Sequence, residues 1–222
     1  KPPAKKFAAW SYSRLGDYEQ CPLRAKLKHL DRIQEPSSPA MERGAAVHKA
    51  AEAYVTGKLR RLPEELKLFK GKFAGLKKSK TVMAEKQWAF TATWQPCDWF
   101  SPSAWCRMVV DVSSVAEGAV LSIVDYKTGK IRAEEQRPQL SLYALGGFLM
   151  FPAVTVVKAE FWYLDAGETM GELIPRQSSD GLKTYWTQRV RALLRDSKFA
   201  PRPNDKCRWC HYSKAKAGLC KF

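Results

Sequence analysis

The sequence lacks the features that mark membrane, exported and repetitive proteins. No run of about 18 apolar residues occurs, so we expect no transmembrane helix and no membrane partner. The basic start of the chain, residues 1–10, has no apolar core like that of a secretory signal, so export has no support. The period or bias of collagen, coiled coils and low-complexity chains is also absent. We therefore expect a globular, cytoplasmic protein, with a virus or a mobile element as one source of such a chain.

What the chain has in excess is positive charge. Its 222 residues carry 38 Lys+Arg against 22 Asp+Glu, a formal net charge of +16. Segment 58–80 has nine basic residues and two acids, a net +7, and segment 183–222 has eleven and two, a net +9. Such concentration favours a polyanion, most often nucleic acid, although two solvated faces would have the same composition. The candidate DNA-binding residues are Lys70, Lys72, Lys77, Lys78, Lys80, Arg208 and Lys214.

The residue patterns predict a single α/β domain over residues 11–222. A loose basic arm (1–10) would precede it, and an irregular, cysteine-rich basic tail (199–222) would end it. Periodicity and capping residues indicate helices over 11–27 and 40–55. A third helix would have Pro138 in its first turn and end at about residue 149, and a fourth would begin at Asp180 as its N-cap. Strands are indicated over 81–94, 104–114, 119–127 and 154–164, whereas 71–80 is typical of an exposed loop.

Two aspartates and a lysine on a predicted hairpin carry the clearest chemical signal. With a turn at Glu117-Gly118, Asp111 would lie opposite Val124 and beside Asp125. Asp125 and Lys127 are two residues apart, so their side chains leave the same face of the strand. The two carboxylates would repel each other unless a cation lies between them, and oxygen ligands suit Mg²⁺ or Mn²⁺. The alternative is that both aspartates are strand-end residues paired with Lys127.

The hairpin is one of six motifs that follow one another along the chain. They are Ser11 to Cys21-Pro22, Arg43-Gly44 to His48, Asp111, Asp125-Tyr126-Lys127-Thr128-Gly129-Lys130, Gln139 to Tyr143, and Cys207 to Cys210 with Cys220. In this order they resemble the RecB-type exonuclease branch of the PD-(D/E)XK nuclease superfamily. The resemblance implies a restriction-endonuclease-like core, in which helices flank a mixed central sheet. It also implies metal-dependent hydrolysis of single-stranded or duplex DNA, as an exonuclease acting on free ends.

The resemblance also assigns roles to single residues. The catalytic set would be Asp111, Asp125, Lys127, Gln139 and Tyr143, and the metal ligands would be His48, Asp111, Asp125 and the carbonyl of Tyr126. Gln139 and Tyr143 are four residues apart on one helix and would face the active site or the DNA. Glu52 and Glu85 are further acids that we expect to be structural.

Six cysteines in a chain without support for export argue against a disulfide framework. Cys207 and Cys210 have the spacing of a metal-binding knuckle. By resemblance to the AddB nuclease and the CRISPR-adaptation nucleases, they would join Cys220 and the distant Cys21 around a [4Fe–4S] cluster that fastens the two chain ends. Four thiolates also suit a structural Zn²⁺. The remaining Cys97 and Cys106 have the surroundings of ordinary buried thiols.

Two further functions fit the same residues. A non-catalytic DNA-binding module with zinc at its cysteines would bind DNA in a salt-dependent manner without metal-stimulated cleavage. A scaffold in a recombination or replication complex would use the basic tail on a partner protein. The intact Asp-x-Lys arrangement favours the nuclease. The patterns leave the polarity of digestion and the oligomeric state open.

Overall fold

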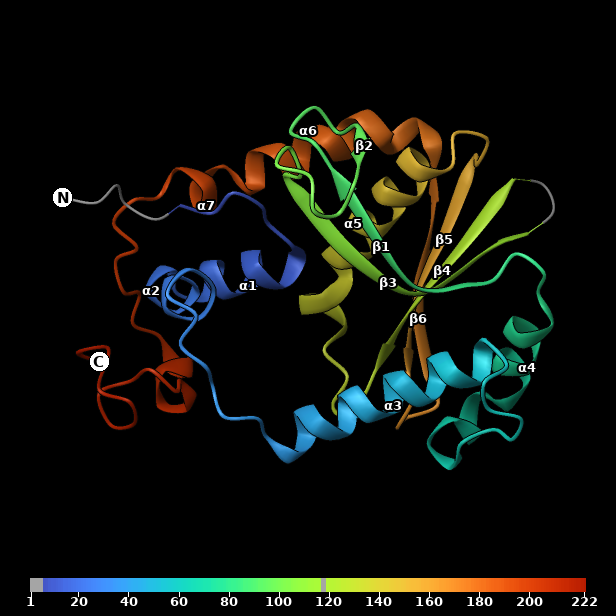
Figure 1. Ribbon diagram of the computed structural model, residues 1–222, viewed down its shortest axis with the longest axis horizontal. Coiled ribbons are helices and arrows are strands. Elements are labelled where there is room, and N and C mark those ends of the chain that lie inside the picture. The colour runs from blue at the N-terminus through green and yellow to red at the C-terminus, as the bar shows by residue number, and fades with distance from the viewer. Residues whose placement is uncertain (1–5, 117–118) are drawn as a thin grey trace.

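A mixed β-sheet of six strands, in the order β2-β1-β3-β4-β5-β6, forms the centre of the protein (Figure 1). The computed structural model describes residues 6–116 and 119–222. The strands are β1 (Met83–Phe90), β2 (Pro96–Cys97), β3 (Cys106–Ala116), β4 (Val120–Lys127), β5 (Val156–Tyr163) and β6 (Glu168–Pro175). β4 and β5 pair in parallel, and the other neighbours are antiparallel. The expected α/β fold with a mixed central sheet is therefore confirmed.

Helices cover both faces of this sheet. They are α1 (Tyr12–Gln20), α2 (Pro22–Ala25), α3 (Pro39–Val55), α4 (Lys70–Lys78), α5 (Ala133–Met150), α6 (Ser179–Arg189) and α7 (Arg191–Arg195), with 3-10 turns at Glu64–Phe69, Arg176–Ser178 and Asp205–Trp209 and a π-helical turn at Lys26–Leu30. Within the part of the chain that the structure describes, no helix is long and apolar enough to cross a membrane.

Two hydrophobic clusters pack the helices onto the sheet. The α5 cluster includes Trp10, Val110, Leu121, Leu145, Phe161 and Trp186. The α3 cluster includes Val47, Ala51, Phe73, Val112, Val124 and Trp162. The sheet is thus buried on both faces, and its interior strands are correspondingly apolar.

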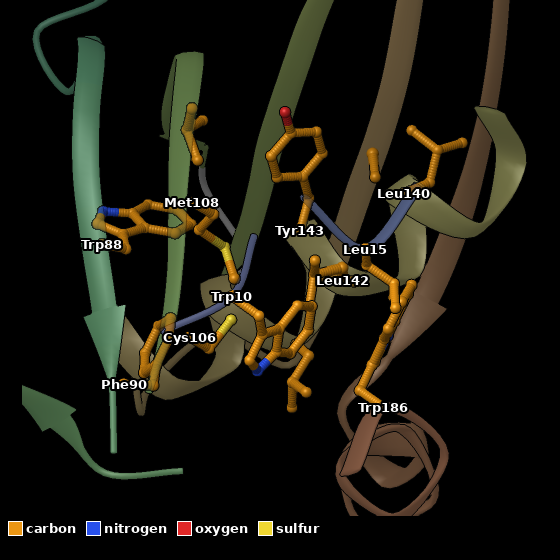
Figure 2. Close-up of a cluster of buried hydrophobic side chains, with 14 of the residues drawn as sticks. Trp10, Leu15, Trp88, Phe90, Cys106, Met108, Leu140, Leu142, Tyr143 and Trp186 are labelled. Atoms are coloured by element: carbon orange, nitrogen blue, oxygen red, sulfur yellow. The ribbon is translucent and has the colours of Figure 1, made fainter. Parts of the chain in front are cut away.

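The N-terminal segment packs into the α5 cluster instead of forming a loose arm. Phe7 is 6% exposed and Trp10 is fully buried. Trp10 forms a β-bridge with Cys106 and stacks on Trp186 with the ring centroids 5.9 Å apart (Figure 2). The prediction of a loose arm is wrong for residues 7–10. Burial of the Phe7 and Trp10 rings stabilises the fold by more than the conformational freedom of a solvated arm would. Residues 1–5 lie outside the described part.

The segment expected to be a loop, residues 71–80, contains helix α4. Phe73 and Leu76 are three residues apart and both are buried, Phe73 against the ring of Trp162. Two apolar side chains on one side of a helix are enough to hold it on the sheet, although they are too few to show as a periodic pattern. The prediction of a loop is therefore wrong.

Three other predicted helices shift at their boundaries. The first helix stops at Gln20, because Cys21 precedes a proline and takes an extended φ of −161°. Helix α5 begins at Ala133, so Pro138 lies inside it and not in its first turn. Helix α6 has Ser178 at its N-cap, and Asp180 lies in the first turn, where a negative charge favours the helix. The predicted helix over 40–55 is confirmed as α3.

The pairing of β3 with β4 differs by one residue from the predicted hairpin. Val112, and not Asp111, pairs with Val124. The predicted turn at Glu117-Gly118 lies outside the described residues. Residues directly opposite each other in an antiparallel pair share one face of the sheet. The predicted register would have placed Asp111 and Asp125 on opposite faces, whereas the observed register brings them level with each other.

Strand β3 changes the face that it presents at Asp111. Alternate residues from Cys106 to Val110 lie in the α5 cluster, whereas Val112 lies in the α3 cluster. Level with Asp111 on β1 is Glu85, whose φ of 49° is in the left-handed region, while the residues on either side of this level pair regularly. Local irregularities of this kind re-aim side chains. Here the two re-aimed side chains are both acidic.

Candidate active site

Asp111 is the centre of the first group of contacts. Its Oδ2 accepts a hydrogen bond of 2.7 Å from the backbone N–H of Tyr126 on β4. Nδ1 of His48, from α3, lies 3.2 Å from the same oxygen. Gly44 lets α3 approach this closely, because a Cβ at that position would lie 3.3 Å from Oγ1 of Thr128. The structure therefore joins the predicted His48 and Asp111 across the α3 face of the sheet.

Asp125 is the centre of the second group. Its Oδ1 accepts hydrogen bonds from the hydroxyl of Tyr143 (2.6 Å) and from Nε2 of Gln139 (3.3 Å). Its Oδ2 lies 2.6 Å from Nζ of Lys127, which also donates to Oε1 of Gln139. The hydroxyl of Tyr143 points out of the apolar cluster toward this group (Figure 2). All four predicted residues are therefore in direct contact.

The charges of the two aspartates dominate the electrostatics of the site. Burial lowers the pKa of His48, but the hydrogen bond and charge of Asp111 more than compensate, so the pKa lies above its ordinary value. Burial and the neighbouring charge of Asp111 raise the pKa of Asp125. Burial and the charge of Asp125 raise the pKa of Tyr143, which keeps its hydroxyl a donor. Two buried carboxylates whose charges act on each other favour a bound cation.

A third acid joins the site that the sequence did not assign to it. Ligand atoms of His48, Glu85 and Asp111 all lie within 4.8 Å of one another. Among the described residues, Oδ2 of Asp125 is buried and accepts no well-directed hydrogen bond, although Lys127 lies beside it. An imidazole and two carboxylates, together with the Oδ2 atom of Asp125 that accepts no well-directed hydrogen bond, are ligands that suit Mg²⁺ or Mn²⁺. The only sequence signal for Glu85 was an acid among the residues of the first strand.

Two hollows open on either side of these residues. A groove of about 830 Å³ is lined by Lys127, Gln139 and Tyr143 together with residues of α1 and β3. A second, more open hollow of about 610 Å³ is lined by His48 and Glu85 from the α3 side. The two buried aspartates thus contact side chains that line two solvent-accessible spaces, His48 on one side and Lys127, Gln139 and Tyr143 on the other.

The loop after Lys127 is held by a network built from two of the sequence motifs. Arg43 on α3 forms a two-pronged ion pair with Asp165, at 2.9 and 2.6 Å. The same carboxylate accepts a hydrogen bond of 2.7 Å from the backbone of Gly129, whose φ is 81°. Arg43 lowers the pKa of Asp165 and so keeps it charged. The network fixes the chain immediately beyond the lysine.

The four cysteines assigned to a cluster line one small cavity at the junction of α2 and the tail. They are Cys21, Cys207, Cys210 and Cys220. The Sγ atoms of Cys21 and Cys207 accept from backbone N–H groups of the tail at 3.4 and 3.3 Å. Among the described residues, no three thiols have their sulfurs all within 4.8 Å of one another. Of the other two cysteines, Cys106 is fully buried and Cys97 partly so.

The basic residues predicted to bind DNA are not among the residues that line these two hollows. Lys70, Lys72, Lys77 and Lys78 belong to α4 and Lys80 follows it, at the opposite end of the molecule from the C-terminus (Figure 1). Lys72 lies 5.0 Å from the Trp162 ring centroid and Lys77 lies 4.2 Å from that of Tyr54, so both have packing roles. Arg208 and Lys214 line a separate hollow in the tail. Their contact with DNA stays a prediction.

Comparisons with known proteins concern the family and the fold of the chain. A family model described as "PD-(D/E)XK nuclease superfamily" matches residues 9–215. No curated protein matches the chain. Among solved structures, SSO0001 is 13% identical, with 99% of this chain and 89% of that chain covered and a TM-score of 0.47. A protein named "Putative exonuclease" from Eubacterium rectale is also 13% identical, with 92% and 88% covered and a TM-score of 0.51. At 13% identity, these two similarities concern the fold alone.

Proposed function

The chain belongs to the PD-(D/E)XK nuclease superfamily, and from this premise we propose that it is a deoxyribonuclease that hydrolyses phosphodiester bonds with Mg²⁺ or Mn²⁺. The observation that supports the proposal most is the ion pair of Asp125 with Lys127 at the edge of an open groove. Asp111 lies beside this pair: it accepts a hydrogen bond from the backbone N–H of Tyr126, the residue between Asp125 and Lys127, and it contacts His48. A carboxylate pair with a lysine suits phosphoryl chemistry, in which negative charge develops on the substrate.

The donor set around Asp111 fits a divalent metal ion. His48, Asp111 and Glu85 would hold the ion, and the oxygen of Asp125 that lacks a well-directed hydrogen bond would be a further ligand. The carbonyl of Tyr126 completes the set that we propose. When bound, the ion supplies a Lewis acid that activates a water and polarises the scissile phosphate.

Lys127 and its neighbours carry the remaining chemistry. The Lys127 ammonium is held between Asp125 and Gln139, at 2.6 and 3.2 Å, and lines the groove. From there it can orient the attacking water and stabilise the negative charge on the phosphate. Gln139 and Tyr143 donate to the same oxygen of Asp125, so they fix the rotamer of its carboxylate. We assign both as positioning residues.

We place the activity at DNA ends, as an exonuclease of the RecB type. The ordered motifs of this branch support the assignment, and the name of the Eubacterium rectale protein of similar fold points in the same direction. Linear and covalently closed circular single-stranded DNA of one sequence separate the two modes of cleavage. An exonuclease degrades the linear form in Mg²⁺ or Mn²⁺, leaves the circle intact, and is inactive in EDTA. Cleavage of the circle would replace the assignment with an endonuclease.

Substitutions test whether the described residues carry the reaction. Asp125→Ala and Lys127→Ala should each lower the rate of cleavage by about 10²-fold or more, because the first removes a proposed metal ligand and the second removes a positive charge beside the reacting phosphate. DNA binding, measured in EDTA, should stay within a few-fold of wild type. Glu52→Gln is a matched control, since Glu52 lines the neighbouring hollow but pairs with Lys58. Wild-type cleavage by both active-site variants would exclude this site.

We also propose a [4Fe–4S] cluster at Cys21, Cys207, Cys210 and Cys220. The four residues come from opposite ends of the chain and line one cavity. A tetrahedral zinc site with Zn–S bonds of about 2.3 Å needs its sulfurs roughly 3.8 Å apart. Among the described residues, no three of the thiols lie within 4.8 Å of one another, so the four do not form such a tetrahedron as they stand. A cubane binds each thiolate at a separate iron and so suits wider spacing.

Purification without air tests the cluster. A brown protein with iron and acid-labile sulfide, both lost in Cys207→Ser, supports it. A colourless protein with one zinc per chain would instead assign Zn²⁺ to the cysteines. Cys97→Ser is the control, because Cys97 is a partly exposed thiol outside the cavity.

A further inference from the structure

The groove beside Lys127 contains two arginines, Arg14 and Arg107, and neither forms an ion pair with an acid in the part of the chain that the structure describes. Arg14, on α1, donates a hydrogen bond of 3.0 Å to the carbonyl of Ala9. The charges that act on it are those of Arg107 and Arg32, and together with burial these lower its pKa. In the described part of the chain, Nε of Arg107 is buried and has no hydrogen-bond partner. Like charges kept together in a half-buried place indicate that an anion belongs between them.

An aromatic ring lies next to these arginines. Trp99 lines the same groove, and the guanidinium carbon of Arg107 is 5.5 Å from its ring centroid. The ring is on the loop between β2 and β3, and the next residue, Phe100, is 86% exposed. A tryptophan beside unpaired arginines is the combination that stacks bases while holding phosphates.

The position of the groove connects these residues to the active site. Arg14, Arg107 and Trp99 line one continuous hollow with Lys127 and Gln139. Its volume of about 830 Å³ is that of a small-ligand pocket, roughly 300–1,000 Å³, and not that of the extended face on which a duplex lies. A segment of one strand fits such a space, and its bases are free to stack because they have no partner strand.

We propose that this groove binds the single strand that flanks the scissile phosphate, with backbone phosphates on Arg14 and Arg107 and a base stacked on Trp99. The proposal rests on the proposed nuclease function for the identity of the polymer. It adds the strand form and the residues that select it. A phosphate between the two guanidinium groups replaces their repulsion with charge-assisted hydrogen bonds.

Binding without cleavage is the direct test. A fluorescein-labelled single-stranded 12-mer and its duplex are titrated in EDTA against Trp99→Ala and Arg107→Gln, and anisotropy gives the Kd. Loss of one stacked base should weaken single-strand binding about tenfold. Arg107→Gln should weaken it to a similar extent and reduce its salt dependence. Duplex binding should change less than twofold in both variants.

Matched substitutions control for folding and total charge. Leu173→Ala removes an exposed apolar side chain of β6 outside the groove, and Arg195→Gln removes an exposed arginine of α7. Both should bind the single strand like wild type. Trp99→Phe and Arg107→Lys keep the ring and the charge and should restore most of the affinity. Thermal unfolding of every variant shows whether the fold is retained.

The outcomes separate this inference from the proposed function. Wild-type single-strand binding by Trp99→Ala and Arg107→Gln, or an equal loss for the duplex, would overturn the groove proposal even if the protein cleaves DNA. A protein that cleaves nothing but loses single-strand binding in these variants would retain the groove and refute the nuclease. In an active enzyme, Trp99→Ala should raise KM for the 12-mer about tenfold and leave kcat within twofold.

Discussion

Glu85 provides the sharpest quantitative test of the metal site, because its charge has opposite effects with and without metal. Without a cation, Glu85 and Asp111 repel each other across at most 4.8 Å. At that distance two unit charges repel by about 0.9 kcal/mol in water and about 3.5 kcal/mol at an effective dielectric constant of about 20. Burial and the charge of Asp111 raise the pKa of Glu85, in agreement with such repulsion. Because Glu85 is partly exposed, we take the lower end.

Glu85→Gln should therefore stabilise the metal-free protein by about 1 kcal/mol. In EDTA at pH 8 this corresponds to a rise in Tm of about 2–4 °C for a chain of this size. With Mn²⁺ the order should reverse. A ligand present at 100 times its Kd stabilises the native state by about 2.7 kcal/mol, and a tenfold to hundredfold loss of affinity removes about half or more of that. The variant should then unfold below the wild-type protein.

Differential scanning fluorimetry in EDTA and in a Mn²⁺ series measures both effects. Glu52→Gln is the matched control: Glu52 lines the same hollow but pairs with Lys58 at 3.2 Å and is not among the three clustered ligands. It should lose no metal response. A Glu85→Gln protein that is less stable in EDTA and keeps the full Mn²⁺ shift would refute the reasoning and return Glu85 to a structural role.

Three further predictions concern the catalytic, packing and ionic features. Lys127→Met should lower kcat by about 10²-fold or more with KM nearly unchanged in steady-state assays, because the lost charge acts on the transition state. Gly146→Ala places a Cβ 2.5 Å from Sδ of Met108. It should lower the free energy of unfolding in urea by about 1–2 kcal/mol, because the clash outweighs the gain in helix propensity. The additional loss that Gly146→Ala causes in a Met108→Ala protein should be far smaller. Burial opposes the charge of Asp17, yet His29 and Lys28 hold its pKa below the ordinary 3.8. Asp17→Asn should therefore cost about 2 kcal/mol at pH 7. This difference should shrink as the pH falls below 3.8, because the carboxyl of the unfolded chain then takes up a proton, whereas the native carboxyl does so only at still lower pH.

The sequence predicted the interior of the fold better than its edges. The helix over 40–55 and the strands around Asp111 and Asp125 have long apolar patterns, and the structure contains all of them. β6 was not predicted, because most of its side chains are exposed and its pattern is weak at the sheet edge. The α4 segment was read as a loop because lysines and glycines surround the two apolar residues that hold it.

The predicted members of the site meet in the structure, but sequence spacing did not give their geometry. A one-residue change of register decides whether Asp111 and Asp125 lie level with each other on neighbouring strands, and the turn residues alone do not fix that register. Glu85 escaped assignment because its position depends on a left-handed φ in the first strand, a conformation that glutamate rarely adopts. Both errors arise from irregular backbone, which periodic patterns do not describe.

The change of face at Asp111 has a consequence for how the two halves of the domain communicate. Val110 and Val112 belong to different clusters, and Asp111 is the single residue of β3 that joins them. Its carboxylate also completes the contact to β4 by accepting from the Tyr126 N–H. A shift in either cluster therefore moves the same carboxylate, since close-packed interiors transmit strain. We therefore expect substitutions in the α5 cluster, on the other side of the sheet from α3, to change the affinity of the proposed metal site, and we expect an ion at Asp111 to stiffen both clusters at once.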